Sequence, residues 1–313
     1  MKLILTIIYV FERWKILTSE LMKFFLRLNG ATIGKNTYIS ISSKIVGGKI
    51  IIGKDCRILE QVRIKASELI VGDSVIISSG CMFTGKSRLS IGDKTYIGKK
   101  ARIDLSREVK IGNDVGFGEN SIIWTHGYFP PADEGYPVTY APVSIEDRAW
   151  VSTGIIVLPG VTIGRKAIIG AGSVITKTVP EGMIVAGNPG KIIKEVKQIL
   201  NEKEFVIILE EIIDQFKPDY IINKRNNEKY ICYEFQTFEI HVIDGIEISA
   251  SNFNSRKKHI VLFKNIDKGY IKIIKQYYWF NFNEKIRIRS NYREVIEMSG
   301  FLQGFGIRFL IND

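Results

Sequence analysis

The sequence predicts a mainly β protein: a parallel β-helix of about seven coils with a protruding loop, preceded by a helix and followed by a small α+β domain. Three observations lead to this fold class. Aliphatic residues recur in steps of six, an Ile-Gly or Val-Gly pair recurs about every 20 residues, and both patterns are absent from residues 201–313.

The six-residue step defines the body of the protein. It is seen, for example, in Ile91, Ile97 and Ile103. Such a step places three short strands in each coil of a triangular prism and directs every aliphatic side chain inward. Each coil then pairs its backbone with the coils above and below, as in other solenoids. The glycine that follows the aliphatic residue predicts tight corners with left-handed backbone angles.

The repeat is interrupted by the stretch IIWTHGYFPPADEGYPVTYAPV, residues 122–143. This stretch contains His126 and four of the chain's eight prolines. The repeat positions on either side, Ile111 and Ile145, lie almost two coils apart along the chain. We therefore predict a loop over residues 125–144 that leaves the prism. Long loops on rigid scaffolds often carry functional residues.

Residues 1–30 are expected to be helical. The first apolar run ends at a Glu-Arg pair and is too short to span a bilayer, and no signal-cleavage site follows it. Further along, apolar residues recur at helical spacing: Leu17, Leu21, Phe24, Phe25 and Leu28. Two interpretations follow. The one we favour is a helix that caps the β-helix, and the alternative is a basic amphipathic helix resting on a membrane surface.

The charge of the chain is concentrated in its first two thirds. The net charge is +11, and residues 1–200 hold 27 Lys and Arg against 17 Asp and Glu. This field suits a phosphorylated or polyanionic ligand, whereas no nucleic-acid motif accompanies it, so nucleic acid is not expected as a partner. Cys56, Cys81 and Cys232 have no zinc-motif spacing and are expected to be buried, reduced thiols of a cytoplasmic protein.

Two segments carry a family resemblance. IEDRAWVSTGIIVLPGVTIGRKAIIGAGSVITKTVP (145–180) and VAGNPGKIIK (185–194) resemble the hexapeptide-repeat acyltransferases, and in particular the branch that O-acetylates sugars. The resemblance covers about residues 25–197. It implies a left-handed β-helix and a homotrimer with acetyl-CoA sites between neighbouring prisms. We accordingly divide the chain into residues 1–30, a β-helix domain over 31–200 with a closing helix over 190–200, and a domain of unknown family over 201–313.

The resemblance also implies roles for residues near the acceptor. His126 lies where the family has its catalytic histidine, and imidazole suits a general base because its pKa is near neutrality. Asn120 matches a residue that contacts the acceptor, although an ordinary corner residue is the alternative. Trp150 matches a tryptophan that walls the acyl pocket, with packing at a coil corner as the alternative.

The donor side of the site is implied mainly through backbone groups. The backbone amide of Thr153 matches the group with which the family binds the thioester carbonyl oxygen. A backbone amide fixed in place can stabilise the negative charge that develops on that oxygen. Ala171 and Gly172 match a segment that contacts pantetheine. Lys177 and Lys191 match positions near the CoA phosphates, with solvated lysines as the alternative.

Other features of the family pattern are absent here. Zinc-dependent β-helix enzymes use three histidines, whereas this β-helix contains one, so no metal is expected. His241 and His259, in strand-like segments of the last domain, are interpreted as structural. Many relatives have a carboxylate directly after the histidine, where this chain has Gly127. Asp133, Glu134 or a backbone carbonyl are the candidates left open for orienting His126.

These features predict an acetyl-CoA-dependent O-acetyltransferase that acts on a sugar hydroxyl in surface-polysaccharide synthesis. It would work in the cytoplasm, with contact between residues 1–30 and the inner face of the membrane as a second location, and would need no metal. One alternative is N-acetylation of a nucleotide-linked amino sugar. The other is a catalytically inactive scaffold or glycan-binding protein.

Overall fold

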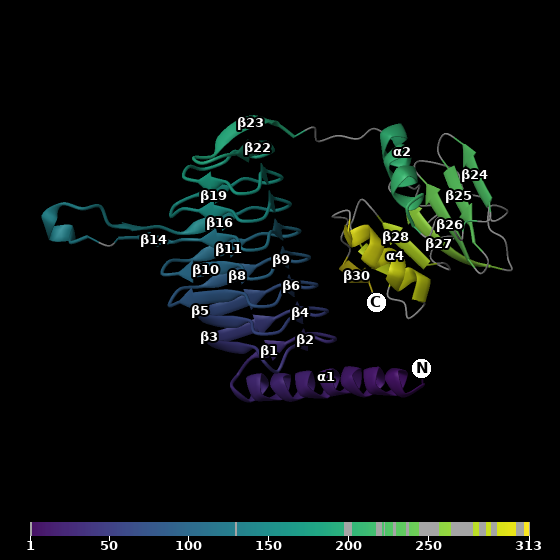
Figure 1. Ribbon diagram of the computed structural model, residues 1–313, viewed down its shortest axis with the longest axis horizontal. Helices are drawn as coiled ribbons and strands as arrows, with labels where there is room; N and C mark the ends of the chain where they lie inside the picture. The colour runs from purple at the N-terminus through teal and green to yellow at the C-terminus, as the bar shows by residue number, and fades with distance from the viewer. Residues whose placement is uncertain are drawn as a thin grey trace. The chain divides into compact units, whose positions relative to one another are not determined.

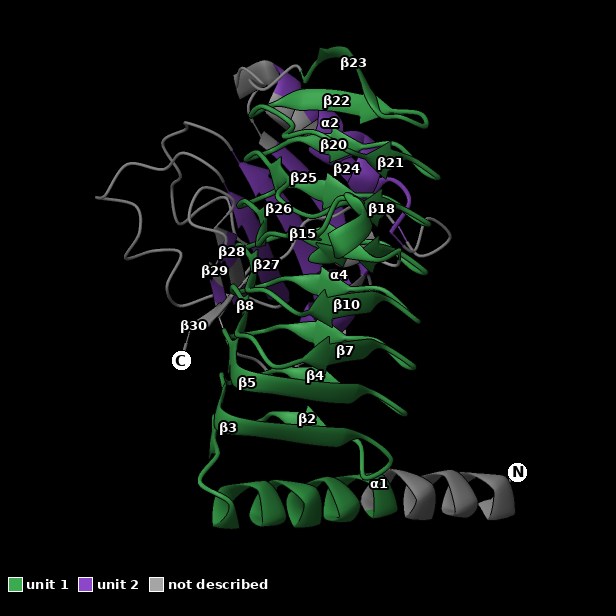
Figure 2. Ribbon diagram, turned by 90° about the vertical axis from the view of Figure 1, so that its left-hand side faces the viewer, with its two compact units in different colours: residues 1–197 green, residues 198–313 purple. Residues whose placement is uncertain are grey.

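The computed structural model describes residues 2–128 and 130–196 and parts of the rest: 202–216, 221, 223–227, 230–235, 238–243, 257–263, 278–281, 286–288, 293–304 and 310–312. Side chains are described from residue 14 on, apart from some positions beyond residue 201. The chain divides into two compact units, Met1–Lys197 and Gln198–Asp313 (Figure 2).

The first unit is a parallel β-helix whose strands stack coil upon coil (Figure 1). Two of its three faces belong to a 12-stranded sheet, because long strands turn a corner and join them. Its strands are β1 (Thr32–Ile33), β3 (Lys44–Ile52), β5 (Arg63–Val71), β7 (Met82–Gly85), β8 (Leu89–Ile91), β10 (Arg102–Leu105), β11 (Val109–Ile111), β13 (Ile122–Ile123), β16 (Val143–Ile145), β18 (Ile156–Val157), β19 (Thr162–Ile163) and β21 (Val174–Ile175).

The third face is a nine-stranded sheet. It comprises β2 (Tyr38–Ile39), β4 (Arg57–Ile58), β6 (Ile76–Ile77), β9 (Tyr96–Ile97), β12 (Gly116–Phe117), β17 (Trp150–Val151), β20 (Ile168–Ile169), β22 (Met183–Ala186) and β23 (Lys191–Glu195). One inward side chain from each coil lies directly on the next, and the ladder is fully buried: Ile39, Ile58, Ile77, Ile97, Phe117, Val151 and Ile169. Each such side chain contributes about 1.5–3 kcal/mol by leaving water. The predicted mainly β solenoid is confirmed.

The repeated glycines act by close approach between coils rather than by left-handed angles. A Cβ on Gly53 would lie 2.5 Å from the carbonyl oxygen of Gly72 in the next coil. The left-handed angles instead fall two residues later, at non-glycine positions such as Asp55 (φ 57°) and Ser74 (φ 56°). The prediction of left-handed corners at these glycines is therefore wrong. A side chain is excluded there because the adjacent backbone occupies its place.

Helix α1 (Lys2–Leu28) closes one end of the β-helix, as the favoured interpretation of residues 1–30 predicted (Figure 1). The Ser19 hydroxyl accepts a hydrogen bond of 2.9 Å from the amide of Ile39. The Arg27 guanidinium donates one of 3.0 Å to the carbonyl of Ile33, and Leu26 is buried against the prism. This side of the helix satisfies backbone groups that the first coil would otherwise leave unpaired.

The apolar stripe of α1 lies on the outer side of the helix. Its members are between 48 % and 67 % exposed: Trp14, Leu17, Leu21, Phe24, Phe25 and Leu28. Across the described residues, none of the helices has both the length and the apolar character needed to cross a membrane.

The other end of the β-helix is closed by a strand, not by the predicted helix over 190–200. Residues 191–195 form β23, which pairs antiparallel with β22. The turn at Pro189 and Gly190 reverses the chain, and the β-branched Ile192 and Ile193 favour an extended backbone. The returning strand pairs with the outer edge of β22, which would otherwise be open.

The predicted loop is a hairpin that projects from the prism between β13 and β16 (Figure 1). Its base is the antiparallel pair β14 (His126–Gly127) and β15 (Thr139–Tyr140). Its outer part contains a 3₁₀ turn, η1 (Ala132–Glu134). The insertion thus places a histidine where the chain leaves the rigid body.

The second unit has the predicted α+β character. A seven-stranded sheet has the order β24 (Asn223–Asn227), β25 (Tyr230–Glu234), β26 (Phe238–Ile243), β27 (Lys258–Phe263), β28 (Tyr278–Asn281), β29 (Ile286–Ile288) and β30 (Leu310–Asn312). Helices α2 (Glu202–Ile213) and α4 (Arg293–Gly304) contribute Ile213 and Met298 to a core shared with Ile240 and Val242 of β26.

Candidate active site

His126 is the first residue of the projecting hairpin and is anchored by its neighbours. Thr125 before it is fully buried, whereas the His126 side chain is 27 % exposed. In the hairpin His126 pairs with Tyr140. The backbone is thus fixed by the β-helix on one side and by the hairpin on the other, while one part of the ring remains open.

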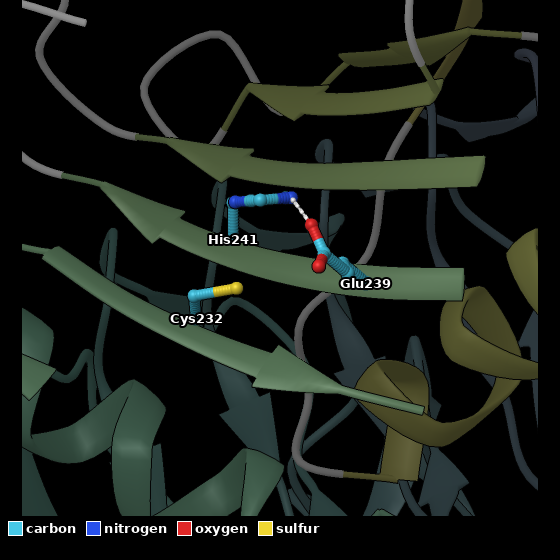
Figure 3. A group of neighbouring side chains, drawn as sticks. All are labelled: Cys232, Glu239 and His241. Atoms are coloured by element: carbon cyan, nitrogen blue, oxygen red, sulfur yellow. Dashed lines mark ion pairs between the residues drawn. The ribbon is translucent and has the colours of Figure 1, made fainter. Parts of the chain in front are cut away.

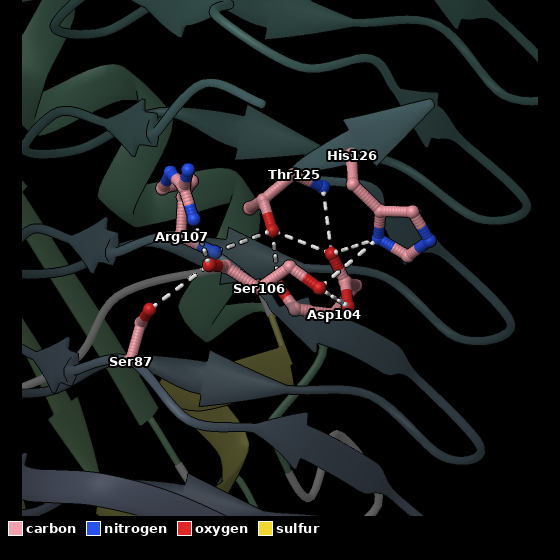
Figure 4. A network of polar contacts seen from close by, with 6 residues as sticks. All are labelled: Ser87, Asp104, Ser106, Arg107, Thr125 and His126. Atoms are coloured by element: carbon pink, nitrogen blue, oxygen red, sulfur yellow. Dashed lines mark hydrogen bonds and ion pairs between the residues drawn. The ribbon is translucent and has the colours of Figure 1, made fainter. Parts of the chain in front are cut away.

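The imidazole is held by a carboxylate from the preceding coil. Asp104, in β10, places its Oδ2 at 2.8 Å from His126 Nδ1 (Figure 4). The same carboxylate accepts a hydrogen bond of 2.5 Å from the Thr125 hydroxyl and one of 2.9 Å from the Ser106 hydroxyl. The backbone amide of Thr125 donates a third, of 3.1 Å.

This network orients the histidine ring through its Nδ1 atom. Burial by itself would raise the pKa of Asp104, but the hydrogen bonds from Thr125, His126 and Ser106 outweigh it and hold that pKa below its usual value. Asp104 is therefore a carboxylate at neutral pH and accepts a hydrogen bond from His126 Nδ1–H. The lone pair of the neutral ring then resides on Nε2, which points away from the network in Figure 4.

Three aromatic rings surround the imidazole. Trp124 lies edge-on with its ring centroid 5.6 Å from that of His126, and Tyr128 lies at the same distance. Tyr140 is stacked on His126 at 6.0 Å, and the guanidinium carbon of Arg107 lies over the Tyr140 ring, 4.6 Å from its centroid. The three rings are between 40 % and 56 % exposed. A base with an open nitrogen, an oriented ring and flat apolar walls can deprotonate the hydroxyl of a ring-shaped acceptor.

A family comparison decides the class of the protein. The family described as bacterial transferase hexapeptide (six repeats) matches residues 142–177, which follow the projecting hairpin directly. The chain thus carries the repeat of the hexapeptide transferases, and the acetyltransferases that it matches support membership of that family. It is thus an acyltransferase.

Curated relatives place this acyltransferase beside sugar O-acetyltransferases. It is 29 % identical over 125 residues to a putative colanic acid biosynthesis acetyltransferase of Escherichia coli, covering 40 % of this chain and 68 % of the relative. It is 34 % identical over 125 residues to the galactoside O-acetyltransferase of Lactococcus lactis, covering 39 % of this chain and 58 % of the relative. The chain thus spans between 58 % and 68 % of the length of these relatives.

The chain also has a partial likeness to a solved structure. The hexapeptide-repeat acetyltransferase VCA0836 of Vibrio cholerae, in complex with acetyl-CoA, is 24 % identical with a TM-score of 0.38. The similarity covers 41 % of this chain and 71 % of that one.

The residues predicted to bind the donor lie at corners of successive coils. The amide of Gly172 donates a hydrogen bond of 3.0 Å to the carbonyl of Thr153, so these two corners are stacked, with Ala171 beside them. Within the described residues the Thr153 amide donates to no acceptor, which leaves it available to a ligand. The backbone amide of Glu119, at the equivalent corner one coil earlier, likewise donates to no acceptor among the described residues. An unpaired amide is therefore shared by these two corners and is not specific to Thr153.

The remaining predicted residues are all exposed: Asn120, Trp150, Lys177 and Lys191. Asn120 has the left-handed backbone (φ 55°) common to the corners, and the Trp150 side chain is 56 % exposed rather than packed in the core. The hydrogen bonds and ring contacts of His126 in the described part of the chain involve none of these residues or the donor-site residues.

Asp104 was not foreseen from the sequence. The candidates for orienting His126, Asp133 and Glu134, lie instead in the outer turn η1 and are exposed. A signal was present: Ile103 pairs with Ile123 in the next coil, so the following residues, Asp104 and Trp124, occupy equivalent positions. Extending the repeat into the interruption by one coil would have placed this carboxylate beside the histidine.

Proposed function

We propose that the protein is an acetyl-CoA-dependent O-acetyltransferase that modifies a saccharide hydroxyl, with His126 as general base and Asp104 as the residue that positions it. The observation that carries this proposal is the 2.8 Å contact between Asp104 Oδ2 and His126 Nδ1, which leaves Nε2 as the basic nitrogen. The acetyl donor follows from the relatives, which are named acetyltransferases.

The reaction proceeds in two stages. His126 Nε2 takes the proton of the acceptor hydroxyl as its oxygen attacks the thioester carbonyl of acetyl-CoA. The negative charge that develops on the carbonyl oxygen is stabilised by the backbone amide of Thr153. The tetrahedral intermediate then collapses, the C–S bond breaks, and the imidazolium returns its proton to the CoA thiolate. The acetyl group passes directly to the acceptor without a covalent acyl-enzyme.

The surroundings of His126 favour a sugar as acceptor. Trp124, Tyr128 and Tyr140 present exposed ring surfaces next to the base. Aromatic faces stack on the C–H faces of sugar rings, and tyrosine hydroxyls add hydrogen bonds. The relatives are named for colanic acid biosynthesis and for galactosides, which supports a surface polysaccharide or its precursor as the acceptor.

An acceptor screen tests the proposal. Purified protein with acetyl-CoA is offered mono- and oligosaccharides, lipid-linked glycans and matched amino sugars, and release of CoA thiol is followed. We expect turnover with a hydroxyl acceptor and retention of a base-labile acetyl ester in the product. Turnover only with the amino sugars would replace O-acetylation by N-acetylation, and no turnover with any acceptor would leave a binding or scaffold role.

The proposal extends to assembly and location, for which the family resemblance and α1 give support. We expect a homotrimer with donor sites between neighbouring prisms, and light scattering that finds an active monomer would contradict this. The outer apolar stripe of α1, which includes Leu17 and Phe24, supports contact with the inner face of a membrane in addition to the capping role. Sedimentation with anionic vesicles measures this contact, and protein that stays in the supernatant at low salt would exclude it.

A further inference from the structure

A second group of chemically reactive side chains lies in the sheet of the other unit. Cys232 in β25 pairs with His241 in β26, and Glu239 in β26 pairs with His259 in β27. Paired residues, and residues two apart in one strand, share a face of the sheet. All four side chains therefore lie on one face, opposite the apolar face that includes Ile240. Figure 3 shows three of them, with the imidazole and the carboxylate directed toward one another.

These side chains are removed from water. Cys232 and His241 are 0 % exposed, Glu239 1 % and His259 3 %. A buried carboxylate needs donors or a cation to replace its hydration. Glu239 Oε2 has no hydrogen-bond partner of acceptable geometry. It nevertheless faces ring nitrogens of both histidines, which hydrogen-bond to each other at 2.9 Å, and a bound cation would take all three atoms as ligands.

The spacing of these atoms is close to that of a metal coordination sphere. His241 Nε2 lies 2.9 Å from His259 Nδ1, and Glu239 Oε2 lies 3.4 Å and 3.3 Å from these two atoms. Zinc–nitrogen and zinc–oxygen bonds of about 2.0–2.2 Å in tetrahedral geometry separate neighbouring ligand atoms by about 3.3 Å. The two distances to Glu239 Oε2 match this separation, whereas the two histidine nitrogens are at hydrogen-bond distance and would move apart to about 3.3 Å on binding an ion. The Cys232 sulfur lies within 4.8 Å of the carboxylate oxygen and the His241 nitrogen.

We propose that Glu239, His241, His259 and Cys232 bind one divalent transition-metal ion of the zinc class. Three ligand atoms lie close together, and the Cys232 sulfur moves toward the ion to complete the tetrahedron. The hydrogen shared by the two facing ring nitrogens moves to the other nitrogen of its ring, so that both present lone pairs to the ion. The thiol loses its proton to solvent as the metal–sulfur bond forms, so one thiolate and one carboxylate balance the charge of the ion. With four protein ligands the site is closed, and its role is to hold three strands together rather than to take part in acyl transfer.

Arg225 offers a competing explanation for the buried negative charge, but its position is also compatible with a bound ion. Its guanidinium lies 3.4 Å from Cys232 Sγ and 3.6 Å from Glu239 Oε1, so it balances part of the negative charge without any metal. It approaches the other carboxylate oxygen, however, and leaves Oε2 to the histidines. The Arg225 side chain is 56 % exposed and can move away from the sulfur while it retains the carboxylate as an outer contact.

Metal binding by the full-length protein tests the proposal without any variant. The protein is stripped with a chelator, incubated with micromolar Zn²⁺ or Co²⁺, desalted and analysed for metal. We expect one ion per chain. The Co²⁺ form should show visible d–d bands of tetrahedral intensity and a near-ultraviolet thiolate-to-cobalt charge-transfer band. Retention of less than about one tenth of an ion per chain, where a structural zinc site should be saturated, would overturn the proposal.

Variants locate the ion. Cys232→Ser should abolish the charge-transfer band, and His241→Ala and His259→Ala should abolish stoichiometric binding. The matched controls are Cys81→Ser, a buried thiol of the β-helix, and His126→Ala, a histidine of the other unit, and both should keep one ion. Binding that survives both histidine substitutions, or a Co²⁺ form without the charge-transfer band, would contradict this site. If a variant does not fold, the spectrum of the unmodified protein decides.

Discussion

The protein has two sites in which histidine and a carboxylate lie together, and we propose different roles for them. His126 is 27 % exposed, contacts one carboxylate, and keeps one ring nitrogen open. His241 and His259 are 0 % and 3 % exposed, and their facing nitrogens are directed at each other and at Glu239. A base must reach both its orienting group and its substrate, whereas a closed set of buried ligands suits an ion. Exposure, more than residue type, separates the proposed roles.

The largest difference between the two sites is expected when the histidines His126 and His259 are replaced one at a time. His126→Ala should lower kcat by about 100-fold or more, because it removes the general base. His259→Ala should leave the rate per folded molecule within about twofold, because the β-helix supplies every group of the proposed reaction. Acetyl-transfer assays on protein checked by circular dichroism measure both. A rate for His126→Ala within a few-fold of the unmodified protein would remove it as the base.

The positioning role of Asp104 gives the next largest effect. Asp104→Asn should lower kcat by about tenfold or more, because the ring loses the carboxylate that fixes its tautomer. The KM for acetyl-CoA should not change, since Asp104 touches neither the donor corners nor their backbone amides. A purely structural role would instead reduce the folded fraction and leave the kcat of folded molecules intact. Steady-state kinetics in both substrates separates these outcomes.

The contrast also explains what could be predicted from the sequence. The six-residue step encodes the β-helix locally, and the interruption of that step revealed the hairpin and His126. Asp104 was missed because it reaches His126 through the stacking of coils, not through proximity along the chain. The cluster of Cys232, Glu239 and His259 was missed for the same reason, since only the pairing of strands assembles it. Contacts between coils and between paired strands, unlike the six-residue repeat, are not marked by a short motif in the sequence.

Orientation of surface elements was equally hard to predict. The apolar stripe of α1 has helical spacing, and such a stripe ordinarily faces the core. In this helix Leu21 and Phe25 lie outward, and the polar Ser19 contacts the first coil by accepting a hydrogen bond from Ile39. The end of a β-helix exposes unpaired backbone groups, so a polar side chain is useful there. The pattern alone does not carry that information.

The aromatic walls provide a smaller effect that concerns the acceptor. Tyr140→Ala should raise the KM for a saccharide acceptor by about threefold to tenfold, the range expected for one lost aromatic contact. Tyr136→Ala is the matched control, because Tyr136 is also exposed on the same hairpin but makes no described contact with His126. The KM for acetyl-CoA should stay constant in both variants. Equal effects of the two substitutions would argue against a platform at Tyr140.

The smallest expected effect is on stability in acid. Hydrogen bonds to the Asp104 carboxylate hold its pKa below the ordinary value of 3.8 in the folded protein. A group with a depressed folded pKa stabilises the protein fully above its unfolded pKa, and this contribution is lost as the pH falls through the folded pKa. The stability difference between the unmodified protein and Asp104→Asn should therefore be constant from about pH 8 to pH 5 and shrink below about pH 4. Urea unfolding at a series of pH values measures it. A difference that persists undiminished well below that range, or that grows as the pH falls, would mean that the carboxylate is not the group that the Thr125 and His126 hydrogen bonds stabilise.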